Sequence, residues 1–311
     1  MKRTYRWILL VLGIVLLALA FTSPLSPYAA RSLRHGWELG HIFLFAILTF
    51  LFFYYPAKRF PRSHRFFYIT LLSTLLLGLA IEFIQMYVGR DFSLGDLGFD
   101  LIGSLTALCC LIAGGALVIN RWLSRAVTVL TAVLGIYAIA PVLFAVVDEV
   151  NMGRSFPLLA DFESTLEVDR WQGDVEIVNL LSSRGEEKVL RIPLSTTHYS
   201  GVSLSYFPRD WRAYKQLSFE FFNPDRRPLD LTIRIHDNKH YDLGKGDYDD
   251  RFNRVLEVMP GWNRFSVDLR DLAKAPANRD MDLANIQEFG LFSIDLPKPR
   301  VIYIDKVRLE P

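Results

Sequence analysis

The chain has almost no cysteine. Its 311 residues include two, Cys109 and Cys110, which are adjacent and lie inside an apolar run. Neighbouring cysteines cannot connect distant segments, so the sequence predicts no disulfide framework, even for a domain outside the cell.

An excess of one charge is also missing, because 35 basic and 33 acidic residues leave a net charge of +2. A field strong enough to bind nucleic acid is therefore excluded. The sequence has no H-E-x-x-H motif, no P-loop and no G-x-S-x-G motif. Catalysis is possible but not indicated.

Apolar residues are abundant, at 51% of the chain, and they are concentrated before residue 147. A bilayer core of about 30 Å needs roughly 20 apolar residues in a helix. Five runs qualify and predict an α-helical transmembrane bundle at 1–150: 7–22, 37–55, 67–88, 101–119 and 127–147. The first follows Lys2, Arg3 and Arg6, but four further spans come after it, and Pro24 and Pro27 do not make an A-x-A cleavage site, which favours an uncleaved helix over a cleaved signal peptide.

The basic residues that flank these runs predict the orientation. Nine lie on one side of the predicted bundle (Lys2, Arg3, Arg6, Lys58, Arg59, Arg62, Arg65, Arg121, Arg125) and four on the other (Arg31, Arg34, Arg90, Arg154). The richer side is expected to be the cytoplasm. Five spans then place the C-terminal half outside the bacterial cytoplasmic membrane, in the periplasm of a Gram-negative cell.

Ionisable side chains interrupt the second, third and fourth runs. A charge in hydrocarbon costs roughly 2.5–3.5 kcal/mol, so such residues usually mark a site. The alternating direction of the helices brings these residues to one depth, near the outer leaflet. The predicted cluster is His41, Glu82, Gln85, Arg90, Asp96 and Asp100.

Several roles are open for this cluster. A histidine with carboxylates can bind a divalent cation, relay protons or act as general acid and base. Arg90 can bind the phosphate of a lipid head group. Ser93 is expected to cap the fourth helix, and a polar core that only holds the helices together is the rival interpretation.

The segment 37–108 resembles a VanZ-like domain. The resemblance rests on His41, Glu82-x-x-Gln85, Arg90-x-x-Ser93-x-x-Asp96 and Gly103. Two features depart from it, because Trp37-Glu38 stands where members commonly have Asp-Lys, and Asp100 where they commonly have Asn. The family is named for an association with glycopeptide antibiotic resistance, and the resemblance implies a membrane protein of the cell envelope without implying a reaction.

After a predicted linker at 151–158, apolar and polar residues alternate with period two, which predicts an all-β sandwich at 159–311. The predicted strands are 189–194, 217–222, 229–235, 254–258, 262–269 and 301–309, with a helical turn at 283–289 and Trp262 in the core.

This half resembles the jelly-roll carbohydrate-binding modules with a galactose-binding-like fold. The resemblance rests on Asp161-Phe162-Glu163, Pro260-Gly261-Trp262-Asn263 and the closing 303–309 segment. It implies a structural calcium between the first and last strands, with Asp161, Glu163 and Asp305 as oxygen ligands. The alternative is that these carboxylates only face water.

A sugar site needs aromatic faces and planar polar side chains. His236, Asn238, His240, Tyr241 and Tyr248 supply both and are the predicted glycan-binding residues. Further candidates are Trp171, Tyr199, Tyr206, Trp211 and Tyr214, although core burial is the commoner role of such aromatics.

Together these patterns predict a VanZ-like envelope protein whose outward β domain binds a glycan, a lipid-linked sugar or an envelope protein. Membrane lipids are the other expected partners. Two alternatives stay open: a membrane enzyme that acts on a lipid-linked envelope precursor, and a purely structural anchor.

Overall fold

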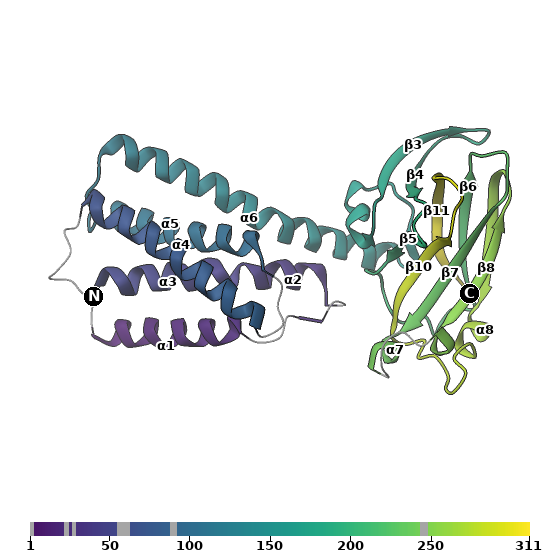
Figure 1. Ribbon diagram of the computed structural model, residues 1–311, viewed down its shortest axis with the longest axis horizontal. Coiled ribbons are helices and arrows are strands. Elements are labelled where there is room, and N and C mark those ends of the chain that lie inside the picture. The colour runs from purple at the N-terminus through teal and green to yellow at the C-terminus, as the bar shows by residue number, and fades with distance from the viewer. Residues whose placement is uncertain (1–2, 22–24, 27–28, 55–62, 88–91, 243–247) are drawn as a thin grey trace. The chain divides into compact units, whose positions relative to one another are not determined.

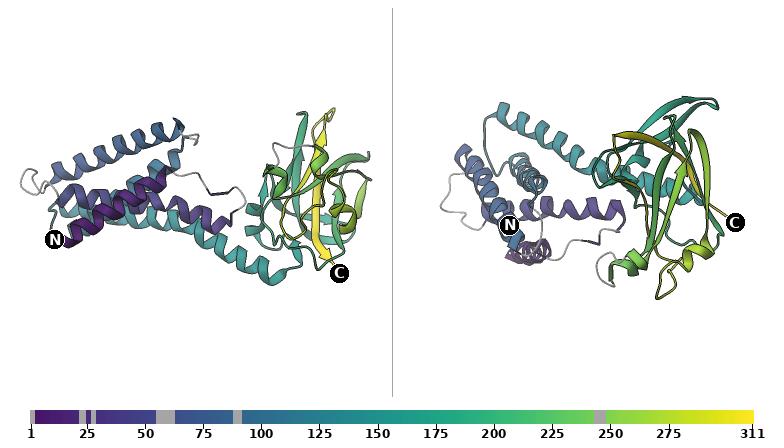
Figure 2. Two further views of the ribbon diagram at one scale, coloured as in Figure 1. Left: turned by 90° about the horizontal axis from the view of Figure 1, so that it is seen from below. Right: turned by 45° about the vertical axis from the view of Figure 1, so that its right-hand side comes forward.

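The computed structural model describes residues 3–21, 25–26, 29–54, 63–87, 92–242 and 248–311. The chain divides into two compact units, residues 1–144 and residues 145–311 (Figure 1). The first unit is helical and the second is an antiparallel β-sandwich, seen from two further directions in Figure 2.

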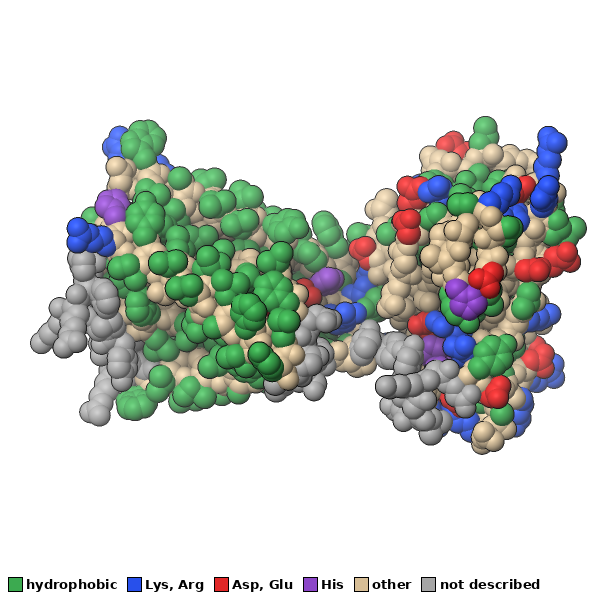
Figure 3. Space-filling model, viewed as in Figure 1, with side chains coloured by type: hydrophobic (Ala, Val, Ile, Leu, Met, Phe, Trp, Pro, Cys, Tyr) green, Lys and Arg blue, Asp and Glu red, His purple; other side chains and the backbone are tan. Residues whose placement is uncertain are grey.

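In the part of the helical unit that the structure describes, six helices begin: α1 (Arg3–Ala20), α2 (Arg31–Glu38), α3 (Gly40–Tyr54), α4 (His64–Tyr87), α5 (Leu94–Ala113) and α6 (Arg121–Ser155). Among the described residues, four helical segments are long and apolar enough to cross a membrane: Arg31–Tyr54, α4, α5 and α6. The sequence predicted five, and the difference lies in α1, whose apolar stretch Trp7–Leu19 is shorter. Large apolar side chains cover the outside of this unit (Figure 3).

Small residues allow α3 and α4 to approach α5. A Cβ atom added at Gly103 would collide with the backbone of Ile42 in α3. One added at Gly78 in α4 would collide with the side chains of Asp100 and Leu97. Glycine is therefore required at both positions, and it brings the polar residues of the three helices into contact.

The sandwich has two sheets. The first has the strand order β3-β4-β11-β6-β9 with β1 added against β11, and the second has the order β2-β5-β10-β7-β8. The strands are β1 (Leu158–Ala160), β2 (Trp171–Gln172), β3 (Glu176–Ser182), β4 (Gly185–Leu194), β5 (Tyr199–Leu204), β6 (Gln216–Asn223), β7 (Leu229–Asp237), β8 (Phe252–Val258), β9 (Gly261–Asp268), β10 (Ile286–Ile294) and β11 (Arg300–Glu310). Short helices α7 (Lys239–Asp242) and α8 (Leu269–Ala273) and the 3₁₀ turns η1 (Thr165–Arg170) and η2 (Tyr248–Asp250) connect them.

The period-two pattern predicted six of these strands, and all six are confirmed. Alternate side chains fill one core between the sheets, among them Phe219, Phe221 and Phe289. The predicted helical turn at 283–289 is wrong, because residues from Ile286 onward belong to β10. Trp262 is not in the core; it is half-buried on the outer face of the first sheet, against Phe222 and beneath the guanidinium of Arg184.

The end of α6 belongs to the sandwich unit. Residues 151–158, for which the sequence predicted a linker, form the last turn of α6 and the start of β1. Arg170 donates two hydrogen bonds to Asp148 Oδ1 and Oδ2 from Nε, and a third from Nη2 to Oδ1 at 2.7 Å. Both side chains are almost fully buried, so this ion pair fixes the end of α6 to η1.

Candidate functional sites

The polar cluster of the helical unit is centred on His41. Its Nδ1 lies 2.9 Å from Asp100 Oδ1, and its Nε2 lies 3.4 Å from Asp96 Oδ2. The two aspartates are one turn apart on α5, so both face the same side of that helix. The imidazole is thereby held between two carboxylates, and the His41 and Asp100 side chains are at least nine-tenths buried.

Glu82 and Gln85 complete the cluster from α4, where both are buried. A carboxylate oxygen of Glu82 accepts a hydrogen bond of 2.8 Å from the Ser93 backbone N–H. The Ser93 hydroxyl accepts one from the Asp96 N–H, which confirms Ser93 as the cap of α5. Arg90 lies outside the described residues. The structure therefore gathers His41, Glu82, Asp96 and Asp100 around the start of α5, and Gln85 is buried one turn beyond Glu82 on α4.

A second buried polar cluster, made only of hydroxyl groups, lies on the same three helices, two turns away from His41, Glu82 and Asp96. Ser104 of α5 bonds with Thr49 of α3 at 3.0 Å and with Thr74 of α4 at 2.7 Å, and all three are buried. These bonds join three helices in an apolar setting, which is how polar groups hold helices together in a membrane. Among the described residues no group of three His, Cys, Asp or Glu has the geometry to hold a metal ion.

The outer face of the second sheet carries a different arrangement. Side chains that alternate with the core project from β5, β10, β7 and β8, and the strand register places them in rows. One row contains Ser203, Gly290, Arg234 and Asn253, and the next contains Gly201, Phe292, Thr232 and Val255. In the strand register Glu288 lies opposite His236, beside the first row. Ile294 lies opposite Tyr199, beyond the second row.

Charge on this face is concentrated at Glu288. Its carboxylate forms an ion pair with Arg234 and accepts a hydrogen bond of 3.0 Å from the Ser203 hydroxyl. The Nε2 atom of His236 lies 3.8 Å away. Burial acts to raise the pKa of Glu288, but His236 and Arg234 outweigh it and lower the pKa to about 2. The carboxylate is therefore ionised at any physiological pH.

Aromatic rings stand beside this charged pair. The side chains of Tyr199 and Phe292 contact edge to face, with centroids 5.8 Å apart, and the Arg234 guanidinium lies 5.9 Å from the Phe292 ring. Tyr199 is 63% exposed. The other predicted aromatic candidates behave differently, since Trp171 and Trp211 are in the core and Tyr214 packs against it.

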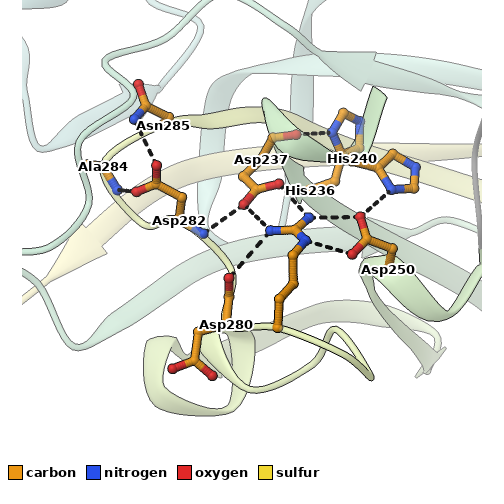
Figure 4. A network of polar contacts seen from close by, with 9 residues as sticks. His236, Asp237, His240, Asp250, Asp280, Asp282, Ala284 and Asn285 are labelled. Atoms are coloured by element: carbon orange, nitrogen blue, oxygen red, sulfur yellow. Dashed lines mark hydrogen bonds and ion pairs between the residues drawn. The ribbon is translucent and has the colours of Figure 1, made fainter. Parts of the chain in front are cut away.

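Two of the five predicted glycan-binding residues, His236 and His240, lie in a largely buried network at the end of β7 (Figure 4). Arg279 bonds two carboxylates at once, those of Asp237 and Asp250. The ring of His240 stacks on that of His236 with centroids 4.8 Å apart, and its Nδ1 lies 3.3 Å from Asp250. Because these groups are buried and bonded to one another, the network ties α7 and η2 to the loop that carries Arg279.

Electrostatics agrees with that structural role. The hydrogen bonds of Arg279 lower the pKa of Asp250, and they lower that of Asp237 against the opposing effect of burial. Burial, together with the charge of His236, lowers the pKa of His240. At neutral pH the carboxylates are thus ionised against Arg279, and His240 is neutral.

The remaining predicted residues differ in exposure. Asn238 is half-buried, and its backbone N–H donates to Asn285. The side chain of Tyr241 lies outside the described residues. Tyr248 is 64% exposed and lines a small polar cleft of about 310 Å³ with Arg251 and Asn253. Asn253 belongs to the outer face of the second sheet, so this cleft adjoins it.

The carboxylates predicted to bind calcium each have a protein partner. Asp305 accepts from the Lys306 N–H and lies 3.3 Å from its ammonium group, which also lies 3.0 Å from Glu187. Asp161 accepts from the N–H of Glu163 at 3.4 Å, and Glu163 pairs with Lys188. This arrangement does not bring the three together as a shared cation site, and calcium stays a prediction of the resemblance alone.

Sequence reasoning missed Arg234, Glu288 and Phe292. Glu288 and Phe292 lie on β10, where apolar residues on both faces hide the alternation. Glu288, Gly290 and Phe292 are spaced two residues apart, so in a strand they share one face. This spacing is the sequence signal that could have indicated the outer face of the second sheet.

No family model matches the chain, and no curated protein matches it. The VanZ-like resemblance therefore stays a prediction.

Solved structures similar to this chain are carbohydrate-binding modules and glycoside hydrolases. A family 11 carbohydrate-binding module from Clostridium thermocellum, in complex with a β-1,3-1,4-mixed-linked tetrasaccharide, is 17% identical with a TM-score of 0.37, over 49% of this chain and 94% of that one. A carbohydrate-binding module specific for non-crystalline cellulose is 12% identical with a TM-score of 0.33, over 50% and 94%.

An exo-β-agarase is 15% identical with a TM-score of 0.40, and the likeness covers 50% of this chain and 25% of the agarase. This chain thus matches about a quarter of the enzyme's length.

Proposed function

We propose that the protein is a membrane-anchored glycan-binding protein of the bacterial envelope. In this proposal the helical unit is embedded in the cytoplasmic membrane as a VanZ-like domain, and the sandwich binds a glycan on the outer side of that membrane. The glycan lies across the outer face of the sheet β2-β5-β10-β7-β8.

The observation that carries this proposal is the exposed ring of Tyr199, which contacts Phe292, together with the Arg234–Glu288 pair, whose guanidinium lies 5.9 Å from the Phe292 ring. An aromatic face takes the C–H surface of a sugar ring, while guanidinium, carboxylate and amide groups bond its hydroxyls. Ser203 and His236 hold Glu288 in place, so the polar groups are positioned before a ligand arrives. The rows extend across four strands, which suits an extended chain of sugars.

The membrane location is supported by the four long apolar helices and by the apolar exterior of the unit. Helix α1 has 18 residues, about 27 Å at about 1.5 Å per residue, which is close to the bilayer core. With α1 as a fifth crossing, the proposed topology has the N-terminus inside and the sandwich outside. A reporter fused at the C-terminus tests it, and reporter activity in the cytoplasm would contradict it.

The test of glycan binding is a glycan array probed with the full-length protein in detergent, followed by affinity measurements on two variants. Tyr199→Ala removes the proposed stacking ring, and Tyr248→Ala removes an equally exposed tyrosine from the neighbouring cleft. We expect Tyr199→Ala to weaken binding by about tenfold or more, since a stacked aromatic at a binding hot spot is worth about 2 kcal/mol. An array without hits, or binding that survives Tyr199→Ala, would contradict the proposal.

A further inference from the structure

The helical unit contains a groove that the glycan proposal does not use. It has a volume of about 1070 Å³ and runs between α5 and α6, with Phe67 and Leu71 of α4 at its wall. Its α6 side extends from Val127 to Phe144, about 25 Å of helix at about 1.5 Å per residue. This is the length of a long hydrocarbon chain rather than of a compact molecule.

One end of the groove is closed and apolar. There Val127 and Leu134 of α6 pack with Leu105 and Leu108 of α5. The Cys109 thiol also approaches the Thr131 hydroxyl, at 3.5 Å. A chain that lies in the groove would therefore end against this contact between the helices.

The other end of the groove is polar and acidic. Its polar lining residues are His35, Glu38, Ser93 and Asp96, at the end of α2 and the start of α5. Two of them are carboxylates, and no lysine or arginine is among the described residues that line the groove. Asp96 also contacts His41, so the groove opens directly onto the polar cluster. Glu38 lies 3.5 Å from His35 as Asp96 lies 3.4 Å from His41, so a cationic group at this end would share each carboxylate with an imidazole.

Gly98 of α5 lines the groove between its two ends and has no side chain to fill it. A Cβ atom added there would meet nothing within 4 Å, in contrast to Gly78 and Gly103, which helix packing requires. A glycine inside a helix costs about 1 kcal/mol relative to alanine. At Gly98, as at Gly135, packing within the described chain does not require glycine, but Gly98 lines the groove and a larger side chain there would enter it.

From these features we propose that the groove binds an amphiphile with one long hydrocarbon chain and an ammonium head group. The chain lies along α5 and α6 over Gly98, and the head lies between Glu38 and Asp96. This inference does not rest on glycan binding, because it concerns only residues of the helical unit.

A photoreactive probe tests this site. The full-length protein in nonionic detergent is mixed with hexadecylamine that carries a diazirine at the end of its chain, irradiated, and digested for mass spectrometry. We expect adducts on the groove residues of α5 and α6. A probe with the same chain and a phosphate head should label these residues about tenfold less, because its charge repels the carboxylates.

Two comparisons complete the test, one between two glycine variants and one between Glu38→Gln and the wild type. Gly98→Leu places a side chain in the groove and should abolish the groove adducts, whereas Gly135→Leu, on α6 and also without a neighbour within 4 Å, should not. Glu38→Gln, at a half-exposed position, should reduce labelling by the amine about tenfold relative to wild type. Labelling spread evenly over α1 and over α4 residues other than Phe67 and Leu71, equal labelling of the two glycine variants, or preference for the phosphate probe would each overturn the proposal.

Discussion

Glu288 links the stability of the sandwich to pH, and its removal gives a quantitative prediction. Folding lowers the pKa of this carboxyl from 4.5 to about 2. Each tenfold change in proton affinity is worth about 1.4 kcal/mol, so the ionised side chain stabilises the fold by about 3 kcal/mol. Because the folded-state pKa is the lower one, this stabilisation is complete above pH 4.5 and is lost as the pH falls toward 2.

The perturbation is Glu288→Gln, which keeps the shape and removes the charge opposite Arg234. We expect the variant to lose about 3 kcal/mol in the free energy of unfolding at pH 7, and to approach the wild type as the pH falls below 4. Urea unfolding at a series of pH values, followed by tryptophan fluorescence, measures both curves. Trp171 and Trp211 report on the sandwich core.

The control is Glu257→Gln, an exposed carboxyl on β8, which should unfold like the wild type at every pH. A difference between Glu288→Gln and wild type that stays constant from pH 7 to pH 3 would refute the reasoning. It would mean that the variant acts through packing or through the hydroxyl of Ser203, and that the charge of Glu288 contributes little.

Three further substitutions follow from buried contacts. Arg170→Met leaves Asp148 buried without its cation and should cost about 3–5 kcal/mol in urea unfolding, and a deficit below 1 kcal/mol would contradict a buried pair. Arg279→Met should destabilise the sandwich by a similar amount and expose the chain near η2 to proteolysis, while resistance equal to wild type would refute the network's role. Gly103→Ala should lower the melting temperature of the detergent-solubilised protein, because its Cβ meets the backbone of α3, whereas Gly98→Ala should not.

The sequence predicts much of the fold because its two halves differ in how apolar residues are arranged. The first half has long apolar runs, and in the second half apolar and polar residues alternate with period two. Alternation with period two located six strands, whereas β1, β2, β3, β5 and β10 were missed. In β5 and β10 the residues Gly201, Gly290 and the outward Phe292 interrupt the alternation. The length of α1 is the other difference, since a run of apolar letters does not reveal where a helix ends.

The polar cluster was predictable in composition because helical spacing places Asp96 and Asp100 on one face. That His41 lies between them could not be predicted, since it depends on how closely Gly103 lets two helices approach. The face of the second sheet was not predictable either. Its charged pair, Arg234 and Glu288, is 54 residues apart and meets only through the strand register.

The most direct test of the central claim is a footprint of the bound glycan. Hydroxyl-radical labelling of the full-length protein, with and without a glycan identified on the array, measures which side chains the ligand covers. Binding across the second sheet predicts protection of Tyr199 and Phe292, with Trp262 and Tyr303 on the opposite sheet unchanged. Protection of Trp262 and Tyr303 while Tyr199 stays fully reactive would contradict it.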